Sequence, residues 1–96
     1  MKVRFLNEAR DELRGAVKYY NRQRPGLGGE LRDEVRAAVS LIQQHPLAWH
    51  PLNELNRRCH TNRFPYGLIY TIYQDEIVII AVAHLHREPE YWSDRI

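Results

Sequence analysis

The fold can be predicted from the segment between Arg57 and Trp92, which reads RRCHTNRFPYGLIYTIYQDEIVIIAVAHLHREPEYW. It contains two apolar runs, Tyr66–Tyr73 and Ile77–His84, joined by a short polar turn at Gln74-Asp75-Glu76. Runs of this length that are rich in β-branched and aromatic residues predict strands, and the short polar connection predicts an antiparallel hairpin. Ile77–His84 is apolar on both faces, which is typical of a strand covered on both sides of its sheet.

Basic side chains gather at the ends of these two strands. Arg63 comes just before the first strand, and His84 ends the second and is followed by Arg87. The start of the first strand of a hairpin lies beside the end of the second, so we expect Arg63 and His84 at one edge of the sheet. His84 is in phase with the apolar residues Val78, Ile80 and Val82.

These residue types have chemistry that suits a phosphate or carboxylate group. Arginine can hold either group through two hydrogen bonds, and a histidine with a pKa of ~6.5 can transfer a proton as a general acid or base. Tyr91 could stack on a base or take part in proton transfer. The alternative is structural: Arg63 is a surface arginine, and His84 marks the point where the strand leaves the core.

Further binding residues flank this cluster. Arg57 and Arg58 are neighbours in a weaker strand predicted over residues 55–62, so they point to opposite faces and only one can join the cluster. His86 lies on the same side of the extended chain as His84. We expect Trp92 to plug the core.

The residues before this stretch predict a cover for the sheet. Residues 2–6 alternate as in a strand. Apolar residues at helical spacing predict one helix over residues 8–22, with Glu8, Asp11 and Glu12 in its first turns, where the helix dipole favours acids. A second helix carries Leu31 and Val35 and ends at His45-Pro46.

The remaining segments are expected to connect these elements. Residues 23–29 contain proline and three glycines and predict a loop between the helices, and residues 46–54 have no clear period. Residues 87–96 could form a final helical turn. The expected order is β-α-α-β-β-β, an α+β fold whose small, mostly antiparallel sheet carries the helical hairpin on one face. We expect residues 1–96 to form a single domain.

Composition narrows the classes of function. The chain has 96 residues, of which 44% are hydrophobic and 27% charged, as in globular proteins. Its single cysteine, Cys59, excludes an intramolecular disulfide, and its five histidines lack metal-ligand spacing. No metal or other cofactor is therefore expected. There is no apolar run of signal-peptide or membrane-helix type, so a cytoplasmic location without membrane contact is expected.

Charge is divided unevenly along the chain. The net charge is +2, but residues 1–48 hold nine Lys and Arg against six Asp and Glu, giving +3. Residues 49–96 hold five against six, giving −1. Binding to nucleic acid would therefore depend on a local basic cluster rather than on an overall positive field.

Four segments in order resemble the RelE/ParE superfamily of bacterial type II toxin–antitoxin toxins. They are RPGLGGEL, QHPLAW, RFPYGLIYTI and IIAVAHLHREPEYW, and the resemblance covers essentially the full chain. It is strongest to the ParE-like branch, often labelled plasmid stabilisation. The resemblance implies a cognate antitoxin that wraps the toxin and holds it inactive, with operator DNA bound only through that antitoxin.

The same resemblance implies two possible targets. RelE-like members are enzymes that cleave mRNA on the ribosome without a metal. Arg63 would then match their phosphate-binding arginine, His84 and Arg87 their basic groups after the last strand, and Tyr91 their C-terminal tyrosine. ParE-like members instead inhibit DNA gyrase and are not known as nucleases.

The sequence favours the hypothesis that the target is gyrase and leaves mRNA cleavage open. The only lysines, Lys2 and Lys18, lie far upstream of the cluster, and the second half carries a net negative charge. Both features are unlike those of RelE-like nucleases. A third possibility is a degenerate relative that only binds its antitoxin.

Overall fold

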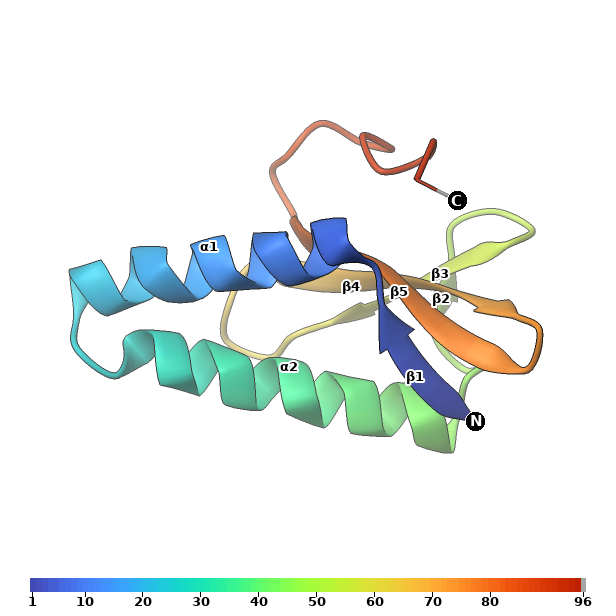
Figure 1. Ribbon diagram of the computed structural model, residues 1–96, viewed down its shortest axis with the longest axis horizontal. Helices are drawn as coiled ribbons and strands as arrows, with labels where there is room; N and C mark the ends of the chain where they lie inside the picture. Colours follow the sequence, from blue (N-terminus) through green and yellow to red (C-terminus); the bar gives the residue numbers. More distant parts are fainter. Residues whose placement is uncertain (96) are drawn as a thin grey trace.

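The computed structural model describes residues 1–95 and confirms the expected α+β fold (Figure 1). Its elements are β1 (Lys2–Phe5), α1 (Asn7–Gln23), α2 (Leu27–Gln44), β2 (His50–Pro51), β3 (Asn56–His60), β4 (Tyr66–Tyr73) and β5 (Glu76–His84). The order is the expected one with a short extra strand, β2, inside the segment predicted as a loop. Neither helix is long and apolar enough to span a membrane.

The sheet has the strand order β1-β5-β4-β3-β2. β1 pairs with β5 in parallel, and the other pairs are antiparallel, as expected of a mostly antiparallel sheet. The hairpin between β4 and β5 closes through Gln74 and Asp75, which have φ angles of 50° and 61°. Positive φ at both central residues is the geometry that matches the twist of paired strands.

Both faces of the sheet are covered. The paired helices α1 and α2 lie side by side and pack against one face, where Leu68, Tyr70 and Ile79 are buried (Figure 1). On the opposite face, here called the outer face, the C-terminal segment packs Trp92, only 5% exposed, with Ile69 and Ile80. This confirms that β5 is covered on both sides and that Trp92 is a plug.

A β-bulge in β5 changes which residues share a face. Ile69 pairs with Ala81, whereas the next residue, Tyr70, pairs with Ile79, so Ile80 is an additional residue in β5. Beyond Ile80 the alternation is reversed, and His84, paired with Tyr66, lies on the helix face. The predicted phase of His84 with Ile80 is therefore wrong.

Two segments differ from expectation. α2 begins at Leu27, so Gly28 and Gly29 form part of its first turn rather than a loop. Gly26, with φ of 89°, makes the connection between the helices. The segment after β5 forms two successive turns, closed by hydrogen bonds from Ser93 N–H to Glu90 and from Arg95 N–H to Trp92, rather than a helical end.

Candidate functional site

Arg63 is held by carboxylates of α2. Its Nε donates to Glu34 Oε2 at 2.8 Å and its Nη2 to Glu30 Oε1 at 3.0 Å. The backbone N–H groups of Asn62 and Arg63 both donate to Glu34 Oε1 at 2.9 Å. The ends of β4 and β5 do meet at one edge of the sheet, but the Arg63 side chain is turned towards α2 and is neutralised there.

These contacts make acid stability depend on Glu34. Burial alone would raise the pKa of the Glu34 carboxyl, but the hydrogen bonds from Arg63 and Asn62 outweigh it and hold that pKa below its ordinary value of 4.5. A carboxyl with a lowered folded-state pKa stabilises the fold above its unfolded-state pKa, and this stabilisation is lost as the pH falls through the folded-state pKa.

We expect Glu34→Gln to lower the free energy of unfolding by at most about 1 kcal/mol at pH 7, because Arg63 is largely exposed. The difference from the parent chain should shrink once the pH falls below 4.5. Urea unfolding between pH 7 and pH 3 measures this. Asp33→Asn, at an exposed neighbouring position, should show no such trend. A difference for Glu34→Gln that stays constant with pH would contradict the assignment.

His84 lies on the helix face at the end of β5. Its ring packs edge-on against Tyr66, with 5.2 Å between ring centroids. Its Nδ1 accepts a hydrogen bond from the His86 backbone N–H at 3.0 Å. In the neutral ring this places the proton on Nε2, so Nε2 is a donor and Nδ1 is already occupied. The arrangement suits a hydrogen-bond donor better than a general base.

Arg87 and Tyr91 are both held by Glu12 of α1. The Tyr91 hydroxyl donates to Glu12 Oε2 at 2.6 Å, and Arg87 Nη1 lies 3.4 Å from the same oxygen. The Arg87 guanidinium stacks 3.7 Å above the centre of the Tyr91 ring. Burial, followed by the hydrogen bond to Glu12, raises the pKa of the Tyr91 hydroxyl far above its ordinary value. Tyr91 therefore stays protonated and is not a base.

Glu12 is the residue that sequence reasoning missed. Besides Arg87 and Tyr91, it binds both terminal nitrogens of Arg95, at 2.9 and 3.0 Å, and accepts the Val82 backbone N–H at 3.0 Å. Arg95 in turn donates to the Ile80 carbonyl at 3.1 Å. β1 pairs with β5 only as far as Ile79. Beyond that residue, the Glu12 and Arg95 side chains are the hydrogen-bond partners of the Val82 N–H and the Ile80 carbonyl at the edge of β5. The sequence predicted only that Glu12 is an acid in the first turns of the helix and did not indicate these contacts.

Arg57 and Arg58 point to opposite faces, as predicted. Arg57 faces the helix side and its Nη1 donates to the Trp49 carbonyl at 2.8 Å. Arg58 lies on the outer face, where its stem crosses Gly67 so closely that a Cβ there would stand 2.9 Å from Arg58 Cγ and Cδ. Within residues 1–95, Arg58 Nε is the one buried side-chain nitrogen or oxygen without a hydrogen-bond partner.

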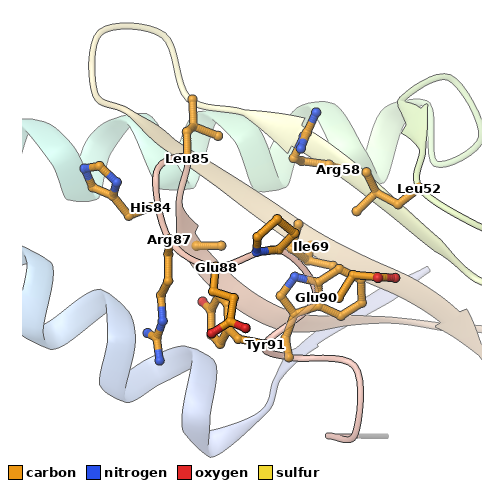
Figure 2. A pocket seen from close by; sticks show the side chains of 12 residues that line it. Leu52, Arg58, Ile69, His84, Leu85, Arg87, Glu88, Glu90 and Tyr91 are labelled. Carbon is orange, nitrogen blue, oxygen red and sulfur yellow. The ribbon is translucent and has the colours of Figure 1, made fainter.

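A cavity of about 260 Å³ opens on the outer face beside Arg58 (Figure 2). Leu52, Ile69 and Trp92 supply apolar walls, and Glu88 and Glu90 of the C-terminal segment line its other side. In Figure 2 the His84 ring and the Arg87 side chain point away from Arg58. His86 is exposed and its ring lies 5.3 Å from that of His84.

The predicted site residues thus separate into two groups. Arg63 is bound to α2, whereas Arg58, His84, Arg87 and Tyr91 all line the cavity of about 260 Å³. Within this second group, Arg87 and Tyr91 are bound to Glu12, and the His84 ring packs against Tyr66. Among residues 1–95, no group of three or more His, Cys, Asp or Glu side chains is arranged to hold a metal ion. The geometry offers binding surfaces rather than a converged acid–base pair.

The chain is similar to toxins of one kind. The model of the family described as "ParE toxin of type II toxin-antitoxin system, parDE" matches residues 3–89. A solved structure entitled "Chromosomal ParDE TA system from P. aeruginosa" matches with a TM-score of 0.78 and 16% sequence identity, over 90% of this chain and 97% of that chain. At that identity the likeness shows the fold alone. No curated protein matches the chain.

Proposed function

Because this chain belongs to the ParE toxin family of type II toxin–antitoxin systems, we propose that it stops growth by binding a protein target, DNA gyrase. We propose further that a cognate antitoxin binds the chain and neutralises it. Operator DNA would be contacted through the antitoxin, because the chain has a net charge of only +2.

One observation carries the choice of a protein target over mRNA. Arg63, Arg87 and Tyr91 are each bound to a glutamate of the same chain. A phosphate in a nuclease site needs uncompensated cations beside a group that can take a proton. Here Arg63 is paired with two glutamates, Arg87 shares Glu12 with Arg95, Tyr91 holds its proton, and His84 offers an occupied Nδ1. These features support an inhibitor that acts by binding.

A supercoiling assay tests the target. We expect the purified chain to inhibit gyrase supercoiling and to arrest growth when it is expressed alone, and expect an equimolar amount of the antitoxin from the adjacent reading frame to relieve both effects. Full supercoiling activity at saturating toxin would refute gyrase as the target. Growth without arrest would point to the third possibility, a chain that only binds its antitoxin.

His84→Ala separates inhibition from RNA cleavage. If the chain acts by binding gyrase, the variant should arrest growth as strongly as the parent, and primer extension on cellular mRNA should show no new 5′ ends. If His84 transfers a proton in RNA cleavage, toxicity should fall by about 10²-fold or more. Arg63→Ala should give the same result as His84→Ala, and new 5′ ends that vanish in both variants would establish the nuclease instead.

A further inference from the structure

We propose that the cavity beside Arg58 on the outer face binds a single acidic side chain, presented among apolar residues by a polypeptide partner. The inference rests on the proposed function only for the class of partner, a protein. It does not require that partner to be gyrase, and it depends on Arg58, which is paired with neither Glu12 nor Glu34 in residues 1–95.

Arg58 differs from the other arginines of the second half of the chain. Arg57 donates to a carbonyl, Arg63 is paired with two glutamates, and Arg87 and Arg95 are paired with Glu12. The Arg58 side chain forms no hydrogen bond or ion pair with any residue from 1 to 95, and its Nε is buried. A buried donor without a partner costs free energy. An incoming acceptor would recover that cost.

The guanidinium is held in place before any ligand arrives. Arg58 is in β3, opposite Ile69 of β4, so its backbone is fixed by strand pairing on both sides. Its stem lies across the space left by Gly67, which pairs with the small residue Ala83. Little side-chain freedom therefore remains to be lost on binding, which favours affinity.

The cavity matches one side chain rather than a polymer of phosphates. Its volume of about 260 Å³ lies below the roughly 300–1,000 Å³ of sites for drug-sized ligands. Its apolar walls, Leu52, Ile69 and Trp92, suit a carboxylate flanked by hydrophobic residues. A nucleic-acid backbone binds through many cations, whereas the lining of this cavity holds two arginines, Arg58 and Arg87, beside Glu88 and Glu90. A carboxylate can accept two hydrogen bonds from one guanidinium.

Two peptides that differ only in charge test the proposal. The probes are acetyl-Leu-Glu-Leu-amide and acetyl-Leu-Gln-Leu-amide, added to the ¹⁵N-labelled full chain while the Arg58 Nε–H signal is followed by NMR. We expect the glutamate peptide to shift this signal and to bind at least about tenfold more tightly than the glutamine peptide, which corresponds to one buried charge-assisted pair. Equal binding, or no shift with either peptide, would overturn the proposal.

Matched variants locate the effect. Arg58→Gln should remove the preference for the glutamate peptide, whereas Arg57→Gln, its neighbour on the opposite face, should keep it. Gly67→Ala keeps the charge but displaces the Arg58 stem, and should weaken binding of the glutamate peptide severalfold. A preference that survives in Arg58→Gln would refute the site. A uridine trinucleotide that shifts the Arg58 signal and binds more tightly than the glutamate peptide would assign the cavity to RNA. None of these measurements involves gyrase, so the two proposals can fail separately.

Discussion

Replacing Glu12 by glutamine is expected to lower the free energy of unfolding by about 3 kcal/mol. Glu12 and Arg95 have side chains only 13% and 14% exposed, and Glu12 also accepts from Tyr91 and from the Val82 backbone. The glutamine keeps the size of the side chain but removes the charge, so Arg95 is left nearly buried without a counter-ion. Removal of one partner of a buried pair typically costs ~3–5 kcal/mol.

Urea unfolding measures this loss, and the adjacent acid provides the control. Asp11 is 73% exposed and, among residues 1–95, pairs with Arg14 alone, so Asp11→Asn should change the free energy of unfolding by less than about 0.5 kcal/mol. Amide exchange in residues 87–95 should show that the C-terminal segment loosens in Glu12→Gln. A loss below about 1 kcal/mol would contradict the central role that we assign to Glu12.

Adjacent glycines at the start of α2 are expected to respond with opposite signs. A Cβ at Gly28 would overlap the Val17 carbonyl oxygen and stand 2.8 Å from the Asn21 side chain, because the backbones of α2 and α1 lie close together there. The Gly28 N–H also donates to Asn21 Oδ1 at 2.8 Å. Gly28→Ala must therefore move one helix away from the other and should cost about 3 kcal/mol.

Gly29→Ala is the matched control. A Cβ at Gly29 would meet nothing within 4 Å, and its backbone is helical. Alanine restricts the unfolded chain and favours the helix, so this variant should gain up to about 1 kcal/mol. Thermal unfolding should then separate the two variants, at about 4–8 °C per kcal/mol for a domain of this size. A Gly28→Ala variant as stable as Gly29→Ala would mean that the helices are not in contact at this point.

Local sequence patterns were sufficient for both helices and for every strand except the two-residue β2. The two strands Tyr66–Tyr73 and Glu76–His84 and both helices follow from periodicity, because each buries one repeated set of side chains. The bulge at Ile80 could not be predicted, since every residue around it is apolar and either alternation fits the sequence. His84 lies on the helix face because of this additional residue in β5.

The candidate site was harder to predict because its partners are distant in sequence. Arg63 meets Glu34 across 29 positions, and Tyr91 meets Glu12 across 79. Spacing along the chain carries no signal for such contacts, and both glutamates look like ordinary surface acids of amphipathic helices. The prediction that Arg57 and Arg58 point to opposite faces was confirmed, because the alternation of side chains along a strand depends only on neighbouring residues.

The bond between Arg95 and Glu12 joins groups 83 positions apart, and β1 pairs with β5 near the far end of the chain. Contacts of such separation slow folding, because the loop between them must close before they form. The contacts between α1 and α2 are local in sequence, so we expect this helical hairpin to form early and the edge of β5 to be completed last. During synthesis, a chain without residues 76–95 has neither the partner strand of β1 nor the ligand of Glu12. Interrupted translation should therefore yield unfinished, protease-sensitive chains rather than folded protein.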